Sequence, residues 1–484
     1  MSSRYLVERH RTDQGALLLM HRVVQKHILS RLEQEPKEFQ QIFDLAVKLI
    51  LAVFPKQSPV QTPQNDLWEE RELVSPHVLN LCKIFEKNLA ALPSAGIEFA
   101  EMLSDASSYF WERGLYTEAF QTSDSAEAIC SRLGNNLSAQ KANIYAIAAA
   151  IRVDHGISQR SNSWDKLNKA LQMRQFHLHV VKPELITDED ITCWGNAWND
   201  IGCGLIDLGF YDVALDFLFL AWEQKRASIL CQQQYNHFPE SPMNVSLALA
   251  GTGRYKESIA LMSETTENTD RNFTRDCAVA QQVHISLASI LVSAGRYSDA
   301  FSEVREVYER SIKLFGLSSR RTSDAAYLLA TVEQKRGNME RAKSILEITL
   351  SRLNGWTIEA EARAKYRLGI ILTHLREKDA AAALIETSQE SLRTLWSQHG
   401  AQSINLGQLD EETAFDLLVS TTAGRSTLGK TLIRGDPGLG PLAMLCGKLL
   451  KQFRAEPDKS PARLRDLLNL ESEDSWLRWS DGVF

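Results

Sequence analysis

The sequence contains few of the residues that interrupt regular structure. Its 484 residues include only 13 Pro and 25 Gly, and hydrophobic and charged residues make up 44% and 24% of the chain. These values are those of an ordinary globular protein and exclude a disordered, collagen-like or low-complexity chain. The net charge is −7, from 54 Lys and Arg against 61 Asp and Glu. That balance excludes a strongly basic protein that coats nucleic acid.

The sequence also lacks a long apolar run. Its most apolar stretch, Phe43 to Phe54, is interrupted by Asp44 and Lys48 and is shorter than the ~20 residues of a membrane span. The first residues include an early Glu8 and no apolar core, which argues against a secretory signal. The 7 Cys are scattered without a Cys-x-x-Cys pair, which is typical of reduced, mostly buried thiols. We therefore expect a cytoplasmic or nuclear protein without a membrane partner.

No catalytic or metal-binding motif stands out. Neither a Ser nor a Cys nucleophile lies in a recognisable local pattern, so the sequence leans away from an enzyme. His177 and His179 have no carboxylate or second pair at ligand spacing, which favours surface histidines over a metal site. We therefore expect no metal and no cofactor.

The sharpest motif match is Gly424 to Thr431, which satisfies the G-x-x-x-x-G-K-S/T pattern of a phosphate-binding loop. A working loop of this kind needs a helix after it and a further strand that carries a Mg²⁺ ligand. Only 53 residues follow Thr431, and Pro437 stands where the helix should run. We interpret the match as chance and do not expect ATP as a ligand.

A basic stretch follows from Arg425 to Arg465, with nine Lys or Arg against three Asp or Glu. Its single aromatic residue, Phe453, provides no stacking platform for bases, so a nucleic-acid partner is not favoured. The preferred interpretation is a solvated amphipathic face docked on the last repeat.

The main signal in the sequence is an internal repeat. A Gly is followed two positions later by an aromatic or apolar residue and five positions later by a small residue, with the glycines at Gly114, Gly209, Gly253, Gly295 and Gly337. The last four are separated by 44, 42 and 42 residues. Gly ends a helix cheaply in the left-handed conformation, and a small residue lets two helices cross closely. The pattern predicts stacked helix–turn–helix units, with a degenerate further copy that has Arg376 in place of the glycine.

The clearest copy reads Trp198, Ile201, Gly202, Leu205, Tyr211, Ala214 and Ala221. This spacing resembles the tetratricopeptide repeat, and the 42-residue period is similar to the long-helix repeats of kinesin light chains. The resemblance covers about residues 94–398. It implies an all-α superhelix of about six or seven helix pairs that binds a protein or peptide partner on its concave side.

A second resemblance lies upstream. Residues 17–25 read LLLMHRVVQ and are followed by the apolar segment 46–54, Trp68 and the pair Pro76-His77. This order resembles the winged-helix segment of fungal signal-transducing NTPases (the STAND or NB-ARC type) that carry a tetratricopeptide sensor. In that family a nucleotide-binding domain precedes the winged helix, whereas this sequence begins inside the winged helix. The resemblance therefore implies the sensor half of such a receptor without its ATPase.

These observations divide the chain into four parts. We expect a winged-helix-like remnant at 1–35, a helical connector at 36–93, the repeat array at 94–398 and a helical segment at 399–484. The first part reads as strand, turn, strand and helix. In the last part we expect helices at 410–420, 441–454 and 459–470.

Candidate partner-binding residues follow from the register of the repeats. The first helix of each pair lines the groove, and its non-packing positions are open to a partner. Nine positions meet this condition: Asn196, Asn199, Asp207, Gln282, Tyr327, Gln334, Arg363, Tyr366 and His374. Amide and Tyr side chains suit the capture of an extended peptide backbone. Solvated polar positions without a partner would give the same pattern.

Three functions remain open at this point. The leading interpretation is a non-enzymatic scaffold or sensor that binds a peptide or protein in the groove. The first alternative is a helical-repeat protein recruited as an enzyme or accessory factor in a fungal biosynthetic pathway, because such a site needs no local motif. The second is a transcription-linked regulator that uses the winged-helix end.

Overall fold

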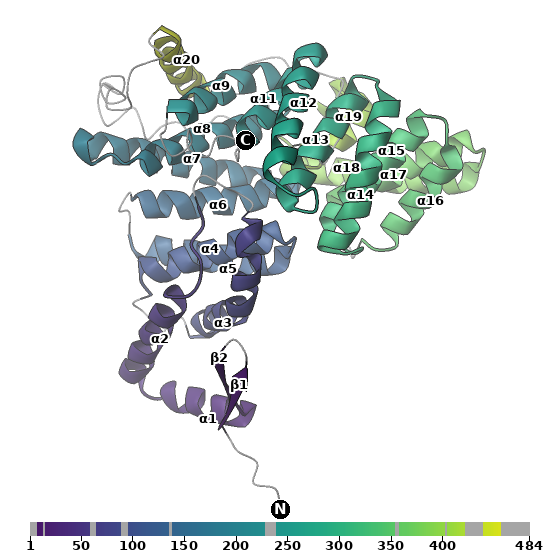
Figure 1. Cartoon of the computed structure of the whole chain (residues 1–484). Coiled ribbons are helices and arrows are strands. Elements are labelled where there is room, and N and C mark those ends of the chain that lie inside the picture. Colours follow the sequence, from purple (N-terminus) through teal and green to yellow (C-terminus); the bar gives the residue numbers. More distant parts are fainter. Residues whose placement is uncertain are drawn as a thin grey trace, which may run out of the picture.

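The computed structural model describes residues 7–12, 15–58, 64–88, 95–134, 138–227, 239–353, 358–401, 404–421 and 439–455. The chain begins with an antiparallel hairpin of β1 (Val7–Thr12) and β2 (Gly15–Met20). Helix α1 (Arg22–Leu32) follows, and the Nδ1 atom of His21 caps it by accepting from the backbone N–H of Val23 at 3.3 Å. The two predicted strands and the helix after them are confirmed, and Figure 1 shows the hairpin and α1 at the lower end of the molecule.

Two helices connect this hairpin to the repeats. They are α2 (Pro36–Leu51) and α3 (Trp68–Lys87), joined by a loop that ends in a short 3₁₀ turn. Buried Arg71 on α3 ties the loop down, because its Nη2 atom donates to the backbone carbonyl of Lys56 at 3.0 Å and to Oε1 of Gln64 at 2.6 Å.

Seven antiparallel helix pairs form the array in the described part of the chain. The pairs are α4 (Ile97–Glu112) with α5 (Tyr116–Arg132), α6 (Ala139–His155) with α7 (Ile157–Val180), α8 (Asp188–Asp207) with α9 (Tyr211–Ala227), α11 (Glu240–Gly251) with α12 (Tyr255–Asn272), α13 (Ala278–Ser293) with α14 (Tyr297–Phe315), α15 (Arg320–Lys335) with α16 (Met339–Leu350), and α17 (Ile358–His374) with α18 (Lys378–His399). The predicted all-α helical-repeat fold is confirmed. The pair α6–α7 lacks the glycine turn motif, so the repeat pattern alone does not reveal it.

The turn between the helices of a pair has the backbone conformation that the repeat predicts. At Gly209, between α8 and α9, φ is 82°, in the left-handed region that disfavours residues with a Cβ. Arg376 occupies the same place between α17 and α18 with φ of 65°, and it is the one non-glycine residue with positive φ among the described residues. The degenerate copy therefore keeps the turn although it has lost the glycine.

Large aromatic side chains fill the space between the helices. Trp194 and Trp198 of α8 are fully buried, and their rings meet edge to face with centroids 6.1 Å apart. Trp198 also contacts the ring of Phe217 on α9, at 5.8 Å between centroids. Because a buried Trp removes ~150–250 Å² from water, this cluster is a major source of stability for the third pair.

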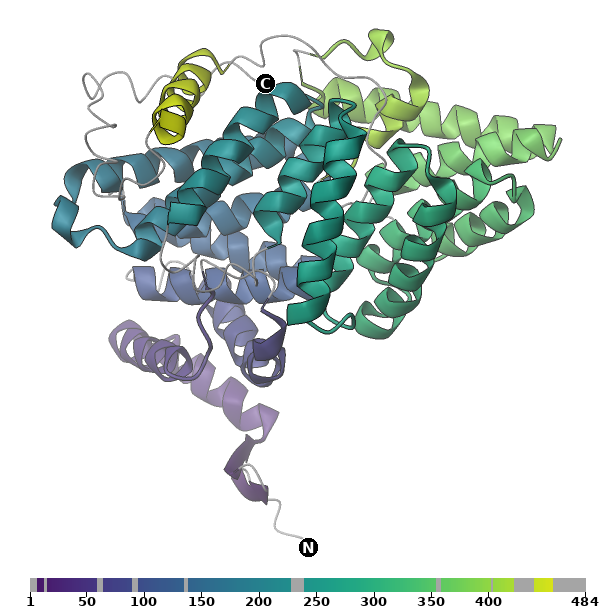
Figure 2. The same cartoon turned by 45° about the horizontal axis from the view of Figure 1, so that its top comes forward.

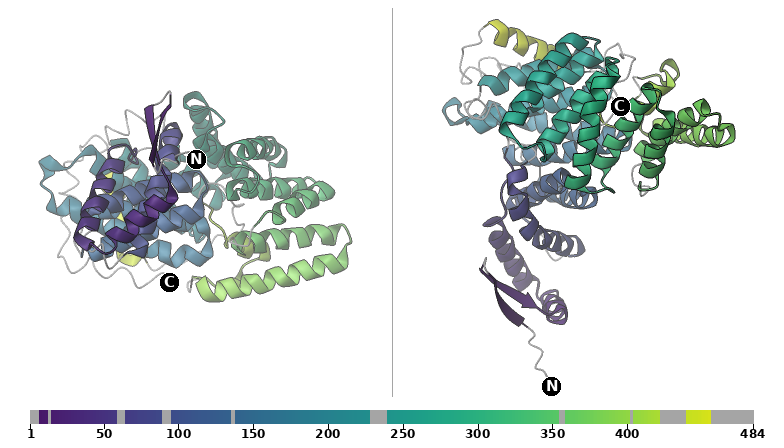
Figure 3. Two further views of the ribbon diagram at one scale, coloured as in Figure 1. Left: turned by 90° about the horizontal axis from the view of Figure 1, so that it is seen from below. Right: turned by 45° about the vertical axis from the view of Figure 1, so that its right-hand side comes forward.

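The superhelix closes on itself. Arg320 at the start of α15 donates from Nη2 to the carbonyl of His155 at 3.1 Å, and the backbone N–H of Ser158 donates to Oε1 of Glu359 at 3.2 Å. Helix α18 also packs on α7. The last two pairs thus contact the second pair, and Figures 2 and 3 show the array from further sides.

The chain after the array returns to the inside of the superhelix. A short helix, α19 (Glu411–Asp416), is followed by non-helical residues 417–421, so the helix predicted at 410–420 is shorter than expected. Helix α20 (Gly440–Ala455) confirms the prediction near 441–454. The motif match at 424–431 and the helix predicted at 459–470 lie outside the described residues.

Helix α20 packs on α9 and not on the last repeat. Its buried residues Leu442, Leu445 and Leu449 join the apolar core around α8 and α9. The prediction that this basic segment docks on the last repeat is therefore wrong for residues 440–455. The last repeat is instead covered by α19, which packs against α17. Within the described residues, no helix combines the length and apolar character that crossing a membrane requires.

Candidate functional site

The first helices of successive pairs enclose a cavity of about 220 Å³ inside the superhelix. Residues of α4, α6, α8, α11 and α13 line it, together with α7 and the loop after α2. This volume is below the ~300–1,000 Å³ of sites for drug-sized ligands, so the space suits a group the size of one side chain. Three of the nine predicted groove residues line the cavity: Asn196, Asn199 and Gln282.

A chain of hydrogen bonds orders the amide groups on one wall. The Nδ2 atom of Asn244 on α11 donates to Oδ1 of Asn199 on α8 at 3.1 Å, and Nδ2 of Asn199 donates to Sγ of Cys203 at 3.7 Å. Asn244 is only 4% exposed, and its Oδ1 atom has no hydrogen-bond partner. Because a buried acceptor without a donor is unfavourable, this carbonyl is available to a donor in the cavity.

The cavity is lined by more acidic than basic residues. Its carboxylates are Asp105, Asp154, Glu189, Asp200 and Glu240. Against them stands one cationic side chain in the lining, that of Arg174. Two of the carboxylates have a hydrogen-bonding or an ionic partner. Asp154 accepts from Nε1 of Trp111 at 2.5 Å, and Glu240 lies 3.8 Å from Nζ of Lys225.

Burial raises the pKa of the carboxyl groups in the walls. It raises the pKa of Asp200 to about 7, although Lys225 and a hydrogen bond from Asn199 oppose the rise. Burial likewise raises the pKa of Asp105 to about 7. The backbone N–H of Gln57, which donates to Oδ1 of Asp105 at 3.2 Å, opposes this rise. Each rise means that desolvation of the carboxylate outweighs the attraction of its present partners.

The rest of the inner surface is covered by the chain itself. Tyr366 of α17 stacks on Phe415, with ring centroids 4.2 Å apart, and donates from its hydroxyl to Oε2 of Glu411 at 2.9 Å. Arg363, one turn earlier, is 1% exposed and has Asp416 at 3.7 Å. Helix α19 therefore occupies the place where a partner of α17 would lie.

A second arginine fixes the neighbouring pair of helices. Arg367 donates from Nε to the hydroxyl of Tyr327 at 3.1 Å and from Nη1 to Oε1 of Gln334, also at 3.1 Å. Its Nη1 atom also lies 2.8 Å from Oε1 of Glu412 on α19. Tyr327 and Gln334 are both buried. Their polar atoms thus serve a network between α15, α17 and α19.

The non-helical residues after α19 are held through their backbone. Asp207 at the end of α8 accepts from the backbone N–H of Thr421 at 2.7 Å. The backbone N–H of Ile157 donates to the carbonyl of Leu418 at 2.9 Å, and Nη2 of Arg160 donates to the carbonyl of Leu417 at 2.6 Å. The inner surface therefore already captures one stretch of peptide backbone, which belongs to this chain.

The nine predicted groove residues fall into three groups. Asn196, Asn199 and Gln282 line the cavity. Five residues contact the chain's own covering segment or its arginine network: Asp207, Tyr327, Gln334, Arg363 and Tyr366. His374 is exposed at the end of α17, away from both. The expectation that all nine face an open groove is corrected for these five contacting residues, because residues 411–421 contact Asp207, Arg363 and Tyr366, while Tyr327 and Gln334 are buried and bonded to Arg367.

Sequence reasoning missed the acidic wall and Asn244. Asp200 follows Asn196 by one helical turn, so helical spacing could have placed it on the same face. Asn244 follows Asn199 by 45 residues, close to the 44-residue repeat between Gly209 and Gly253. Applying the repeat offset to each groove residue would have found it. Asp105 comes from another pair, and no repeat copy of it is evident.

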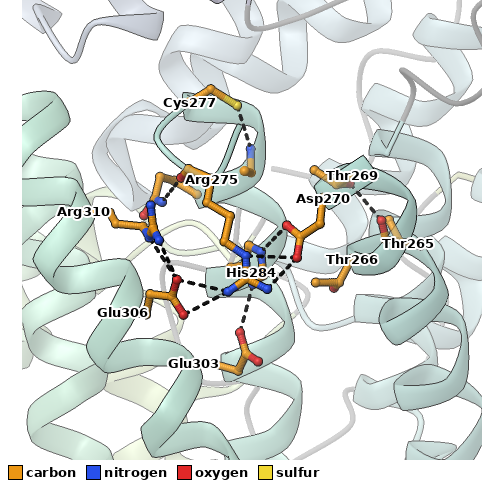
Figure 4. Close-up of polar contacts among 12 residues, drawn as sticks. Thr265, Thr266, Thr269, Asp270, Arg275, Cys277, His284, Glu303, Glu306 and Arg310 are labelled. Carbon is orange, nitrogen blue, oxygen red and sulfur yellow. Dashed lines mark hydrogen bonds and ion pairs between the residues drawn. The ribbon is translucent and has the colours of Figure 1, made fainter. Parts of the chain in front are cut away.

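A separate polar cluster joins α12, α13 and α14 (Figure 4). Buried His284 of α13 lies with Nε2 3.0 Å from Oδ1 of Asp270 and Nδ1 2.9 Å from Oε2 of Glu303. Arg275 links Asp270 to Glu306 by ion pairs of 2.5 and 3.0 Å. Burial opposes a rise in the pKa of His284, but the two carboxylates on one imidazole outweigh it and raise the pKa. In the described part of the chain, no set of three or more His, Cys, Asp or Glu side chains is arranged to hold a metal ion.

Comparison with known proteins gives matches only to solved structures. No protein-family model and no curated protein matches the sequence. A Rap protein complexed with Competence and Sporulation Factor is 15% identical with a TM-score of 0.48, over 78% of this chain and 99% of that one. A STAND protein with a tetratricopeptide repeat sensor from Pyrococcus horikoshii is 14% identical with a TM-score of 0.40, over 82% and 58%. BtubC from P. vanneervenii is 14% identical with a TM-score of 0.34, over 54% and 92%. All three TM-scores lie below 0.5.

Proposed function

We propose that this protein is a non-enzymatic scaffold or sensor that captures a peptide segment of a protein partner inside its superhelix. The proposed site is the amide-lined cavity formed by α4, α6, α8, α11 and α13. The segment enters with its backbone against the first helices of the pairs, and one side chain fills the cavity.

The observation that carries the proposal is the way residues 417–421 are held. Side chains and backbone groups of α7 and α8 contact the carbonyls of Leu417 and Leu418 and the N–H of Thr421. Contacts to backbone atoms do not depend on the side chains of the captured segment, and they are how extended peptides gain affinity. The neighbouring cavity presents side-chain amides, which can donate to a backbone carbonyl and accept from a backbone N–H, at Asn196, Asn199 and Gln282.

The proposal also includes a sensor role for the protein. Residues 17–77 and 94–398 resemble the winged-helix segment and the sensor of signal-transducing NTPases, and the hairpin with α1 has the expected order of elements. We propose that a bound peptide changes the position of the hairpin and α1 relative to the array. We expect hydrogen exchange in α1–α3 to change when peptide binds.

Selection of peptides from a random display library against the purified protein tests the proposal. The dissociation constants of selected peptides are then measured by fluorescence anisotropy. We expect Asn199→Ala to weaken them about tenfold, because a lost hydrogen bond at an enclosed interface costs on the order of 1–3 kcal/mol. Asn162→Ala, at an exposed position of α7, is the matched control. Selected peptides that bind Asn199→Ala as tightly as the unaltered protein would contradict the proposal.

A further inference from the structure

We propose that the wall formed by α8 and α11 is a binding site for an organic cation, an alkylammonium or a guanidinium group, held by Asp200, Glu240 and the carbonyl oxygen of Asn244. If the protein captures a peptide as proposed above, this cationic group is a Lys or Arg side chain of that peptide. This part of the inference rests on the proposed function. A free amine has the same chemistry and is separated from the peptide in the test below.

The charges around this wall are unbalanced. Asp200 and Glu240 both line the cavity, and both are influenced by Lys225 of α9. Its ammonium group lies 3.8 Å from Glu240. One ammonium group cannot neutralise two carboxylates, so the wall carries an excess of negative charge when both are ionised. A second cation in the cavity would remove this excess. Its own desolvation opposes binding, but that of the two carboxylates has already occurred on folding.

Asn244 provides an observation independent of the acidic residues. Its Nδ2 atom is used by Asn199, while its buried Oδ1 atom has no donor. Ammonium and guanidinium groups are pure hydrogen-bond donors, whereas an anion or a carbonyl group would leave this oxygen unsatisfied. The Oδ1 atom of Asn244 therefore favours a ligand that donates hydrogen bonds, and the negative charges of Asp200 and Glu240 favour a cation. An ammonium or guanidinium group meets both conditions.

Size and geometry favour an organic cation over a metal ion. A cavity of about 220 Å³ is far larger than a bare ion and holds the apolar stem of a basic side chain. Ala146, Ile147 and Ala197 in the lining provide apolar contacts for such a stem. The part of the chain that the structure describes contains no metal-binding arrangement of His, Cys, Asp or Glu.

Binding of a cation at this wall must depend on pH. Asp200 is faced by Lys225 of α9 and Glu240 of α11, with Asn199 and Cys203 beside it on α8, and its pKa is about 7. A cation stabilises only the ionised carboxylate, so binding to the protonated form releases a proton. Affinity therefore rises as pH increases through about 7. An alkylammonium stays charged over this range because its pKa is about 10.4.

Ligand-observed NMR titration with four defined probes tests the proposal. The first pair is n-butylammonium chloride and its neutral counterpart n-butanol. The second pair is acetyl-Gly-Gly-Lys-Gly-Gly-amide and the same peptide with norleucine in place of Lys. We expect each charged probe to bind at least about tenfold more tightly than its neutral counterpart, which is the effect of one charge-assisted hydrogen bond.

Substitutions at the wall test whether the preference for charged probes arises there. Asp200→Asn should abolish the preference for the charged probes and its rise with pH. It should melt no lower than the unaltered protein, because it removes a poorly solvated carboxylate. Asp165→Asn, an exposed position on α7, should change neither property. Glu240→Gln is a second variant and should weaken the charged probes in the same direction.

The outcomes separate this proposal from the proposed function. Equal binding of charged and neutral probes, no binding of n-butylammonium, or an unchanged preference in Asp200→Asn would overturn the cation site and leave peptide capture standing. Binding of n-butylammonium without binding of the Lys peptide would support the cation site, identify a free amine as its source, and contradict peptide capture. Binding of both charged probes supports both.

Discussion

Asp207 and Thr421 are 214 residues apart in the sequence, yet the carboxylate of one accepts a hydrogen bond from the backbone N–H of the other at 2.7 Å. Oδ2 of the same carboxylate also accepts from the hydroxyl of Ser420 at 3.1 Å. Asp207 is 4% exposed, so this contact is shielded from water. It holds the end of the covering segment against the third helix pair.

Asp207→Ala should release this segment. We expect a loss of about 1–3 kcal/mol in the free energy of unfolding, because a buried N–H and a hydroxyl lose their acceptor. Amide hydrogen exchange at Ser420 and Thr421 should become faster, as measured by mass spectrometry. Asp207→Asn is the graded control, since its carbonyl can still accept from Thr421, and it should lose less. Unchanged exchange in Asp207→Ala would show that Arg160 and Ile157 hold the segment without it.

Gly156 tests the same covering segment from the opposite side. A Cβ atom at this position would lie 2.7 Å from the carbonyl oxygen of Leu418, and φ is 118°. Gly156→Ala should therefore strain the backbone and displace residues 417–418, with a loss of ~1–3 kcal/mol. Chemical denaturation measures the loss. Gly96→Ala is the matched control, because a Cβ atom there would have no neighbour within 4 Å and φ is −85°.

Gly209→Val should destabilise the array. The φ of 82° at this turn is strongly disfavoured for a β-branched residue, so we expect a loss of roughly 1 kcal/mol or more. Thermal denaturation measures it. A melting temperature equal to that of the unaltered protein would show that the turn between α8 and α9 tolerates another conformation.

The sequence predicted the local features of the fold and missed the long-range ones. The turn at Gly209 and the burial of Trp198 follow from patterns within one repeat, so they could be read directly. The contact of Asp207 with Thr421 depends on where a superhelix of this curvature brings distant segments together, and no local pattern records curvature. Asp105 was missed for a related reason, because it belongs to another pair than Asp200 and lines the same cavity only through the stacking of the pairs. Asp200 itself could have been placed from its spacing to Asn196.

The stability of the array should depend on pH through His284. Burial lowers its pKa, but Glu303 and Asp270 outweigh burial and raise the pKa overall, so the protonated imidazole is favoured in the folded state. The stabilisation is complete below the unfolded pKa of about 6.5 and is lost as pH rises through the higher folded pKa. Burial would raise the pKa of Asp270, but hydrogen bonds from His284 and Arg275 outweigh it and lower the pKa. The contribution of Asp270 is therefore lost as pH falls below its unfolded pKa of about 3.9.

His284→Gln tests this assignment. The difference in unfolding free energy between the two proteins should be largest near pH 5–6 and should shrink as pH rises above about 7. Urea denaturation at a series of pH values measures it. His399→Gln, at the end of α18 and partly exposed, is the control and should show no such dependence. A constant difference between pH 5 and 8 would mean that folding does not shift the pKa of His284.

Asn199→Ala and Tyr366→Ala should have different effects, because Asn199 lines the cavity and Tyr366 lies under the covering segment. Tyr366 is 9% exposed, stacks on Phe415 and donates to Glu411, so its truncation removes packing and a hydrogen bond at once. We expect a loss of about 3–5 kcal/mol, as for other large buried aromatic residues, and faster hydrogen exchange in α19. Asn199 lines the cavity, hydrogen-bonds to Asn244 and Asp200, and makes a longer contact with Cys203. Its truncation should cost less than about 2 kcal/mol and act mainly on ligand binding. If Asn199→Ala unfolds the protein, or if Tyr366→Ala folds as stably as the unaltered chain, the division into an open cavity and a covered half is wrong.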